Sequence, residues 1–402
     1  MLFNDMQQFI IDKSIEWYHD NKSFKPPFQY AGNAGTGKSV VMGEIIRRLG
    51  LNPVLDIAAM SYIGSASILM RMRGLLNAKT IHSWLYDIVE VPLLGPDGKP
   101  MIDKLLNKPI KTAKFIPKES LPEDIKLIVI DEAYTVPMSM RNQIERFGIN
   151  ILAAGDSGQL PPISEAPAYL TPDQNVYYLT QVMRQEGRDD IIFLANKLRL
   201  GMDINYGYYG NSLVINRNEI TDDMLLWADA VICGTNRTRD YYNNRIRSIL
   251  GYSGDMPKYG EKVVCRKNDW LTTISFTNGG EISLVNGLIG RVANNPDIST
   301  FDGKQFTIDF VPDLINNIIF PGVRCNYRHI NAPNKERLIL RKDKYSVGNM
   351  FEYAYAITGW IAQGSQWNNV LYIEDYVHPS LKNQLNYVGA TRAVKNLIYT
   401  KI

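Results

Sequence analysis

The chain has 402 residues, of which 45% are hydrophobic and 21% charged, and its formal net charge is +3 at neutral pH. This composition is ordinary for a soluble globular protein, and the length suffices for two or three domains of roughly 100–200 residues. No apolar run approaches the ~20 residues of a membrane span, and the first residues, MLFNDMQQFIIDK, lack the pattern of a secretion signal. The three cysteines are widely spaced, which argues against a disulfide framework or a cysteine zinc site and indicates the reducing cytoplasm.

The first part of the chain predicts alternating helices and strands. Residues 1–20 carry apolar side chains at helical spacing after Asn4 and Asp5, which predicts an amphipathic helix. A strand leading into a glycine-rich loop, a helix, a strand, a helix and a buried strand are expected next, in PFQYAG, KSVVMGEIIRRLG, PVLDIAAM, ASILMRMRGLL and IKLIVIDEA. Such alternation indicates a parallel sheet covered by helices on both faces.

Residues 87–124 interrupt this pattern. The segment VEVPLLGPDGKPMIDKLL predicts two strands around a turn at Pro96–Gly98. Six lysines cluster in the same region, at positions 99, 104, 108, 111, 114 and 118. We therefore expect an inserted subdomain here.

A second α/β unit is expected from near residue 170. ADAVICGTNRTRDYYNNRIRSILG predicts a strand and then a helix capped by Thr235. From about 258 to 345, EKVVCRKN, LVNGLIGRVANN, KQFTIDFVPD and ERLILRKDKY predict a small module of short strands and turns. The α/β pattern then resumes. The predicted domains are 1–168 with the insert at 87–124, then 169–257 together with 346–402, and 258–345 as the β-rich module.

The glycine-rich loop is the strongest chemical signal in the chain. It reads GNAGTGKS and consists of Gly32, Asn33, Ala34, Gly35, Thr36, Gly37, Lys38 and Ser39. Its glycines let backbone N–H groups approach the phosphates of a nucleotide such as ATP, at the N-terminus of a helix. Lys38 would reach the β- and γ-phosphates and Ser39 would bind Mg²⁺. The alternative is a glycine-rich turn that merely precedes a helix.

Two further strand ends complete a hydrolysis site. Asp131 and Glu132 follow the apolar run LIVI, where Asp131 would hold the metal and Glu132 would polarise the attacking water. In LAAGDSGQLPPI, the carboxamide of Gln159 could sense the γ-phosphate, although the segment also reads as an ordinary strand and turn. Arg184 and Arg392 could stabilise transition-state charge from another domain, although an arginine taken alone is more often a surface residue.

The segments NDMQ, GNAGTGKS, TIHS, IDEA, GDSGQLPP, LTQVMR, NGLIGRV, TGWIAQGSQ and YVGATRA span essentially the full chain in this order. The series resembles superfamily 1 DNA helicases of the RecD/Dda-like branch from bacteria and phages. The resemblance implies two RecA-like P-loop domains with parallel sheets, a β-hairpin insert in the first and an SH3-like β module in the second. The insert would be a wedge that splits the duplex, with Pro96–Gly98 at its tip.

The resemblance also implies an activity and its partners. An ATP- and Mg²⁺-dependent helicase would move 5′→3′ on single-stranded DNA and open forked duplexes during replication, recombination or repair. It would be a monomer of the phage type in the cytoplasm of a bacterial host, and single-strand-binding or replisome proteins are expected partners.

Individual positions take roles from the resemblance. Gln7 is similar to a glutamine that reads adenine, Arg184 and Arg392 to arginines that reach the γ-phosphate, and Gln363 and Gly364 to a motif linking nucleotide to DNA. Gly364 is also predicted to contact the nucleotide. The predicted DNA-binding residues are Thr80, His82, Asn236, Thr358, Trp360 and Ser365. Trp360 and Ile361 replace the usual histidine and lysine, so Trp360 either stacks on a base or packs under the β-rich module.

Three functions stay open at this point. The first is the helicase, and the second is a single-strand translocase that remodels protein–DNA complexes with little unwinding. The third is a P-loop kinase or metabolic ATPase, whose turnover would be indifferent to single-stranded DNA.

Overall fold

The computed structural model describes residues 3–20, 25–103, 106–181, 183, 189–275, 281–296, 304–315 and 318–402. The chain forms two compact units. The first contains Met1–Leu85, Lys118–Gly234 and Gly359–Ile402, and the second contains Tyr86–Pro117 and Thr235–Thr358. Among the described residues, no helix is long and apolar enough to cross a membrane.

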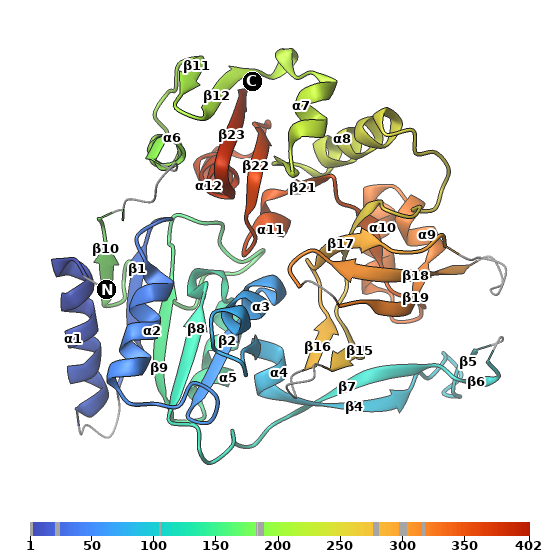
Figure 1. Ribbon diagram of the computed structural model, residues 1–402. Coiled ribbons are helices and arrows are strands. Elements are labelled where there is room, and N and C mark those ends of the chain that lie inside the picture. Colours follow the sequence, from blue (N-terminus) through green and yellow to red (C-terminus); the bar gives the residue numbers. More distant parts are fainter. Residues whose placement is uncertain are drawn as a thin grey trace. The chain divides into compact units, whose positions relative to one another are not determined.

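The first sheet of the first unit is parallel throughout, as the sequence predicts (Figure 1). Its strand order is β10-β1-β9-β8-β2-β3. The strands are β1 (Phe28–Gly32), β2 (Ile57–Ser61), β3 (Lys79–Thr80), β8 (Leu127–Asp131), β9 (Asn150–Gly155) and β10 (Val176–Leu179). The expected domain boundary at 168 falls before β10, which pairs with β1 and so extends the first sheet.

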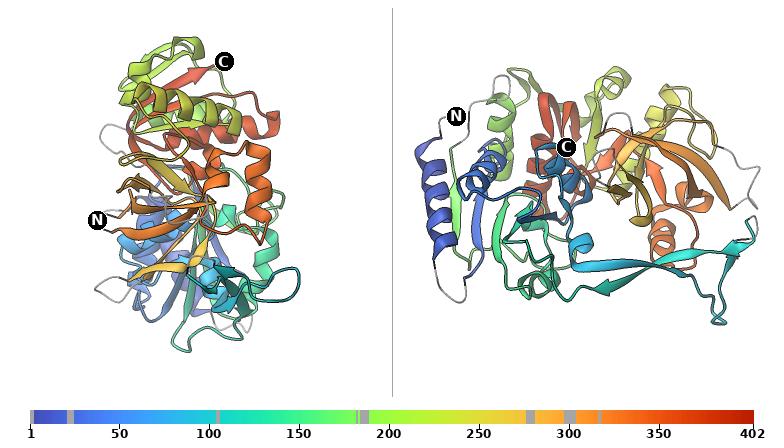
Figure 2. Two further views of the ribbon diagram at one scale, coloured as in Figure 1. Left: turned by 90° about the vertical axis from the view of Figure 1, so that its right-hand side faces the viewer. Right: turned by 60° about the horizontal axis from the view of Figure 1, so that its bottom comes forward.

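Helices and apolar strand residues form the core on one face of this sheet. The helices of this part are α1 (Asp5–His19), α2 (Lys38–Arg48), α3 (Gly64–Met72), α4 (Ile81–Leu85), η1 (Ala133–Thr135) and α5 (Met138–Glu145). Apolar side chains of α1 and α2 pack on alternate residues of β1, β2, β8 and β9. The right-hand view of Figure 2 shows the dark-blue α1 alongside this sheet. The predicted helix forms as α1, and Asn4 caps it in a reciprocal pair with Gln7.

A second sheet lies in the same unit and contains the order β11-β12-β23-β22-β13. Its strands are β11 (Gly207–Tyr209), β12 (Ser212–Asn216), β13 (Ala230–Cys233), β22 (Trp367–Ile373) and β23 (Ala393–Lys401). Only β11 is antiparallel to its neighbour among these pairs. The accompanying helices are α6 (Asp189–Arg199), η2 (Arg217–Glu219), α7 (Asp222–Trp227), α11 (Gly359–Ala362) and α12 (Pro379–Thr391).

The second unit begins with the predicted insert. Its long ribbon pairs β4 (Tyr86–Pro92) with β7 (Lys111–Pro117), and a short pair, β5 (Ile102–Asp103) and β6 (Lys108–Pro109), lies beyond it. The predicted turn forms, since the Gly95 N–H donates to the Lys99 carbonyl at 2.8 Å and Gly98 has φ of 76°. The segment after this turn is not the main partner of β4, however. The longer pairing with β7 forms more backbone hydrogen bonds than the turn does.

The β-rich module is built on an antiparallel sheet in the order β19-β18-β17-β14-β20. The strands of the module are β14 (Lys262–Cys265), β15 (Asp269–Ser275), β16 (Glu281–Leu284), β17 (Ile289–Val292), β18 (Gln305–Pro312), β19 (Phe320–Asn326) and β20 (Phe351–Tyr353). This unit also contains α8 (Asn236–Ile249), α9 (Tyr327–Asn331), α10 (Asn334–Lys342) and β21 (Ala356–Thr358). Thr235 caps α8 as expected.

The expectation of a strand in ERLILRKDKY was wrong, because most of this segment forms α10. Leu338 and Ile339 are exposed while Leu340 is buried, so the apolar residues do not alternate between two faces of a sheet. The charged residues that flank them are good helix formers.

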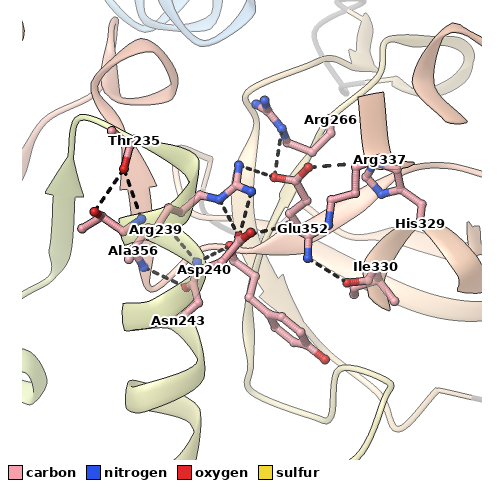
Figure 3. A network of polar contacts seen from close by, with 12 residues as sticks. Thr235, Arg239, Asp240, Asn243, Arg266, His329, Ile330, Arg337, Glu352 and Ala356 are labelled. Atoms are coloured by element: carbon pink, nitrogen blue, oxygen red, sulfur yellow. Dashed lines mark hydrogen bonds and ion pairs between the residues drawn. The ribbon is translucent and has the colours of Figure 1, made fainter. Parts of the chain in front are cut away.

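A buried ion network joins four elements of the second unit (Figure 3). The Glu352 carboxylate of β20 lies 2.7 Å from Nη1 of Arg239 in α8 and 3.3 Å from Nε of Arg266 after β14. Arg341 of α10 approaches the same carboxylate at 3.5 Å. Burial disfavours the charged form of Glu352, but the arginines around it hold its pKa below the ordinary value. The network therefore ties α8 and α10 to the sheet.

Candidate nucleotide site

The loop of residues 32–39 joins β1 to α2, with its glycines where side chains would not fit. A Cβ on Gly32 would lie 2.4 Å from the Thr36 Oγ1 atom, and one on Gly37 would lie 2.6 Å from the Gln7 Nε2 atom. Gly37 also has φ of 83°, which favours glycine. The Lys38 ammonium donates to the carbonyls of Gly32 at 2.8 Å and Asn33 at 3.0 Å. The loop thus encloses a cation, as a phosphate site requires.

Gln7 lies against this loop, where the sequence places it. Its side chain is buried, and its Nε2 donates to the Thr36 carbonyl at 3.1 Å. Its Oε1 accepts the Asn4 N–H at 3.2 Å within the cap of α1. The cap therefore fixes the position of the Gln7 amide beside the loop.

Asp131 and Glu132 lie at the carboxyl end of β8. Glu132 has φ of 52°, a left-handed conformation that is costly for a residue with a side chain. Gly155 at the end of β9 makes room, since a Cβ there would lie 2.9 Å from the Ala133 nitrogen. Burial raises the pKa of both carboxyls, and the charge of Asp131 raises that of Glu132 further, while Lys38 opposes both shifts.

Ser39 and Asp131 line one cavity of about 410 Å³ between α2 and α3. A hydroxyl and a carboxylate that line the same cavity are oxygen ligands of the kind that suits Mg²⁺. Arg73, at the C-terminal end of α3, lines the same cavity and donates from Nη1 to the Ser39 Oγ atom at 2.8 Å. No local pattern around Arg73 predicts this contact, because it depends on how α3 packs.

Gln159 follows β9 and is buried, and its Oε1 atom has no hydrogen-bond partner among the residues that the structure describes. An acceptor left unpaired in a buried position is costly, and such atoms are often reserved for a ligand or water. Asp156 shapes this loop, since its Oδ1 accepts the Gly158 N–H at 2.9 Å and its carbonyl accepts the Gln159 N–H at 3.1 Å.

Arg392 lies at the C-terminal end of α12 and is buried. Its guanidinium donates to the carbonyls of Val388 at 3.1 Å and Ser365 at 3.4 Å, and to the Thr391 hydroxyl at 3.0 Å. Its charge is close enough to oppose the raised pKa of Glu132. Arg184, the other predicted arginine, lies outside the described residues.

Comparisons with known proteins agree with this arrangement. A family model described as an AAA domain matches residues 28–213. The ATP-dependent DNA helicase RRM3 of Saccharomyces cerevisiae is 24% identical over 307 residues, which cover 65% of this chain and 39% of that protein. The ATP-dependent DNA helicase PIF1 of Emericella nidulans is 26% identical over 326 residues, covering 68% and 40%. The chain thus spans well under half the length of these relatives.

Solved structures agree over the whole chain. The crystal structure of Pif1 helicase from Candida albicans has a TM-score of 0.56 at 17% identity, covering 100% of this chain and 95% of that one. Pif1 helicase from Bacteroides, in complex with ADP-AlF3 and ssDNA, has a TM-score of 0.53 at 14% identity, covering 100% and 93%. The chain is similar to Pif1-like helicases of superfamily 1. The predicted resemblance is confirmed, as is the fold class of two RecA-like domains with parallel sheets.

The segment TGWIAQGSQ contacts α3 in the first unit. The Ser65 hydroxyl donates to the Gln363 carbonyl at 3.4 Å, and the Gln363 Nε2 donates to the Leu160 carbonyl at 3.2 Å. Gly364 has φ of 75°, and a Cβ on it would lie 3.0 Å from the Ser65 hydroxyl. Gly364 is thus placed against the first turn of α3, and its predicted nucleotide contact stays a prediction.

The predicted DNA-binding residues are divided between the two units. Thr80, His82, Trp360 and Ser365 belong to the first, and Asn236 and Thr358 to the second. Thr80 is buried with its hydroxyl 3.0 Å from that of Ser83, and burial lowers the pKa of His82. Within the described part of the chain, the indole N–H of Trp360 has no hydrogen-bond partner.

Two residues near the P-loop were missed by sequence reasoning. Arg199 of α6 forms a hydrogen bond with the Asn33 side chain. Tyr387 of α12 contacts the Ala34 backbone and Asp156. Tyr387 lies within YVGATRA, but nothing local in that segment shows which residue its hydroxyl meets.

Proposed function

We propose that this chain is an ATP-dependent DNA helicase that moves along single-stranded DNA and separates duplex strands. The observation that carries the proposal is the grouping of Lys38, Ser39, Asp131, Glu132 and Gln159 at the carboxyl ends of β1, β8 and β9. The proposal is also supported by two relatives that are named ATP-dependent DNA helicases and by the similar crystal structure of a Bacteroides helicase in complex with single-stranded DNA.

The residues divide the chemistry of ATP hydrolysis among them. The loop N–H groups and Lys38 would hold the phosphates, and Ser39 and Asp131 would hold Mg²⁺, which neutralises phosphate charge when bound. The Glu132 carboxylate would accept a proton from the attacking water. Its burial favours that role, because a raised pKa makes a stronger base. Gln159 would use its unpaired Oε1 to orient the water, and Arg392, with Arg184, would stabilise charge in the transition state.

The DNA-binding part of the proposal rests on less specific chemistry. Backbone phosphates would supply most of the affinity, without sequence preference. The unpaired indole N–H of Trp360 favours a DNA contact over simple packing, because a bound strand would supply an acceptor. We also propose that the β4–β7 ribbon is the strand-splitting wedge, that the β-rich module is SH3-like, and that movement is 5′→3′. A monomer in a bacterial cytoplasm, working with single-strand-binding proteins, completes the proposal.

ATP turnover with and without single-stranded DNA tests the function, together with unwinding of forks that carry only a 5′ or only a 3′ tail. We expect DNA-stimulated turnover and opening of the 5′-tailed fork. Lys38→Ala should abolish turnover, whereas Lys126→Ala, which removes a surface ion pair with Asp56, should not. Turnover indifferent to DNA would favour a metabolic ATPase. Stimulated turnover without fork opening would favour the translocase.

A further inference from the structure

Tyr387 places a buried hydroxyl between two motifs that are far from it in sequence. The residue belongs to α12, beside the second sheet, and its side chain is buried. Its hydroxyl oxygen accepts the Ala34 N–H of the P-loop at 2.9 Å, and the hydroxyl donates to Asp156 Oδ2 at 2.5 Å. The single hydroxyl thus connects the P-loop, the loop after β9 and α12.

Both partners of this hydroxyl belong to the nucleotide site. P-loop N–H groups are the donors that meet phosphate oxygens, and the Ala34 N–H is used by Tyr387 instead. Asp156 binds Tyr387 with one oxygen and the Gly158 N–H with the other, and its carbonyl accepts the N–H of Gln159. A shift of the Tyr387 hydroxyl would therefore be passed to the backbone that positions Gln159.

The helix end of this connection is fixed to the second sheet. A Cβ on Gly389, two residues after Tyr387, would lie only 1.9 Å from the Tyr372 ring of β22, so α12 packs very closely on that strand. Arg392 bonds to the carbonyl of Val388, the residue that follows Tyr387. Any movement of Tyr387 with α12 thus involves both the sheet and Arg392.

We propose that Tyr387 is a positioning residue that couples the γ-phosphate in the P-loop to α12 and, through the second RecA-like domain, to the grip on single-stranded DNA. This inference rests on the proposed function. A γ-phosphate offers the Ala34 N–H a charged acceptor that competes with the tyrosine hydroxyl. Whether the Tyr387–Asp156 pair moves with α12 or with the P-loop therefore depends on whether a γ-phosphate is bound. Nucleotide binding and DNA binding then affect each other reciprocally.

Tyr387→Phe tests the proposal because it removes only the hydroxyl. Affinity for a fluorescent oligothymidine is measured by anisotropy with ADP and with the non-hydrolysable ATP analogue AMP-PNP, and the ratio of the two affinities is the readout. We expect the ratio to fall to within about two-fold of 1 in Tyr387→Phe, and stimulation of ATP turnover by DNA to fall about ten-fold. A uniformly weakened site would change both affinities and leave their ratio intact.

Tyr372→Phe is the matched control. It also deletes a buried hydroxyl, which bonds to Asn386 Oδ1 of the same helix at 2.8 Å but does not touch the P-loop. Its ratio should equal that of the wild type. Asp156→Asn should lower the ratio as Tyr387→Phe does, and the double variant should show no further fall.

The outcomes separate the inference from the function on which it rests. A wild-type ratio in Tyr387→Phe, or an equal fall in Tyr372→Phe, would overturn the role of Tyr387 while leaving the helicase intact. Wild-type turnover that does not respond to single-stranded DNA would instead overturn the proposed function, and the inference with it.

Discussion

Glu132 carries two energetic costs, both of which are typical of a residue at a hydrolysis site. Its backbone is left-handed, and its carboxyl is buried next to Asp131, so burial and a like charge both raise its pKa. Strain and a raised pKa on one side chain are typical of functional sites rather than of structural ones. Lys38 and Arg392 partly offset the charge without forming a direct ion pair with it among the described contacts.

Glu132→Gln should keep nucleotide binding and lower DNA-stimulated ATP turnover by about 10²–10⁴-fold, because the amide cannot accept a proton from water. Steady-state turnover and binding of a fluorescent ADP check the two parts. Glu123→Gln, at an exposed position, is the control and should behave as the wild type. Turnover above a tenth of the wild-type rate would exclude Glu132 as the base.

Arg73 sets a second expectation at the scale of one side chain. Its guanidinium lies 2.8 Å from the hydroxyl of Ser39, which we propose as a metal ligand, so it repels a divalent cation there. Arg73→Ala should lower the Mg²⁺ concentration at half-maximal nucleotide binding several-fold. Arg47→Ala is matched, since Arg47 lines the same cavity but pairs with Glu44. An unchanged Mg²⁺ requirement in Arg73→Ala would contradict this expectation.

At the scale of elements, the Glu352 network determines how α8 and α10 are held. Arg239 contacts Glu352 and also Asp240, which in turn lies 3.0 Å from Arg337 of α10. Four arginines thus share two carboxylates, and Glu352 is buried. Removing one partner of a buried ion pair leaves the others uncompensated, which costs far more than breaking a surface pair.

Glu352→Gln should therefore lower the free energy of unfolding by about 3–5 kcal/mol, measured by urea denaturation. Glu336→Gln is the control, because it breaks a more exposed pair with Arg328 and should cost less than about 1 kcal/mol. Similar small losses in both variants would show that the network contributes little to stability.

His329 gives this network a dependence on pH. Burial lowers the pKa of His329 from 6.5 to about 4, so the ring is neutral in the folded chain at pH 7. The unfolded chain takes up a proton as pH falls below 6.5, and the folded chain does not until about pH 4. The stabilisation that the neutral His329 ring contributes to the folded chain is thus complete above pH 6.5 and is lost as pH falls toward 4.

The corresponding loss of unfolding free energy is at most about 3 kcal/mol. Urea denaturation between pH 5 and 7, a window above the lowered pKa of Glu352, measures the first part of this loss, about 2 kcal/mol. His329→Gln should show a shallower dependence on pH than the wild type. An identical dependence of the unfolding free energy on pH in His329→Gln and the wild type would show that His329 is not its source.

At the scale of the whole molecule, the insert can be tested without disturbing its base. The β4–β7 pairing extends to Pro92 and Lys111, so residues 94–109 can be replaced by a short Gly-Asn turn. We expect the variant to keep DNA-stimulated ATP turnover and to lose most fork opening, measured by strand displacement. Because the excision also removes an ion pair between Asp103 and Arg324, Asp103→Asn is the control. Fork opening that survives the excision would end the wedge assignment.

Sequence alone determined the parts of this protein that depend on neighbours along the chain. The P-loop, Lys38 and Ser39 follow from one strand–loop–helix segment, and the caps at Asn4 and Thr235 follow from a few residues each. The order of the motifs was enough to predict two RecA-like domains through the family resemblance it carries, and Asp131 and Gln159 lie at or just after the ends of strands of the parallel sheet. Local patterns suffice there because backbone geometry and phosphate binding are short-range.

Tertiary structure alone decided which distant groups meet. Tyr387 and Ala34 are 353 positions apart, and Arg73 reaches Ser39 only because α3 packs beside α2. The helical conformation of α10 and the pairing of β10 with β1 likewise depend on packing against the rest of the fold. Such contacts are determined by burial and packing between elements, so a local pattern of residues does not predict them.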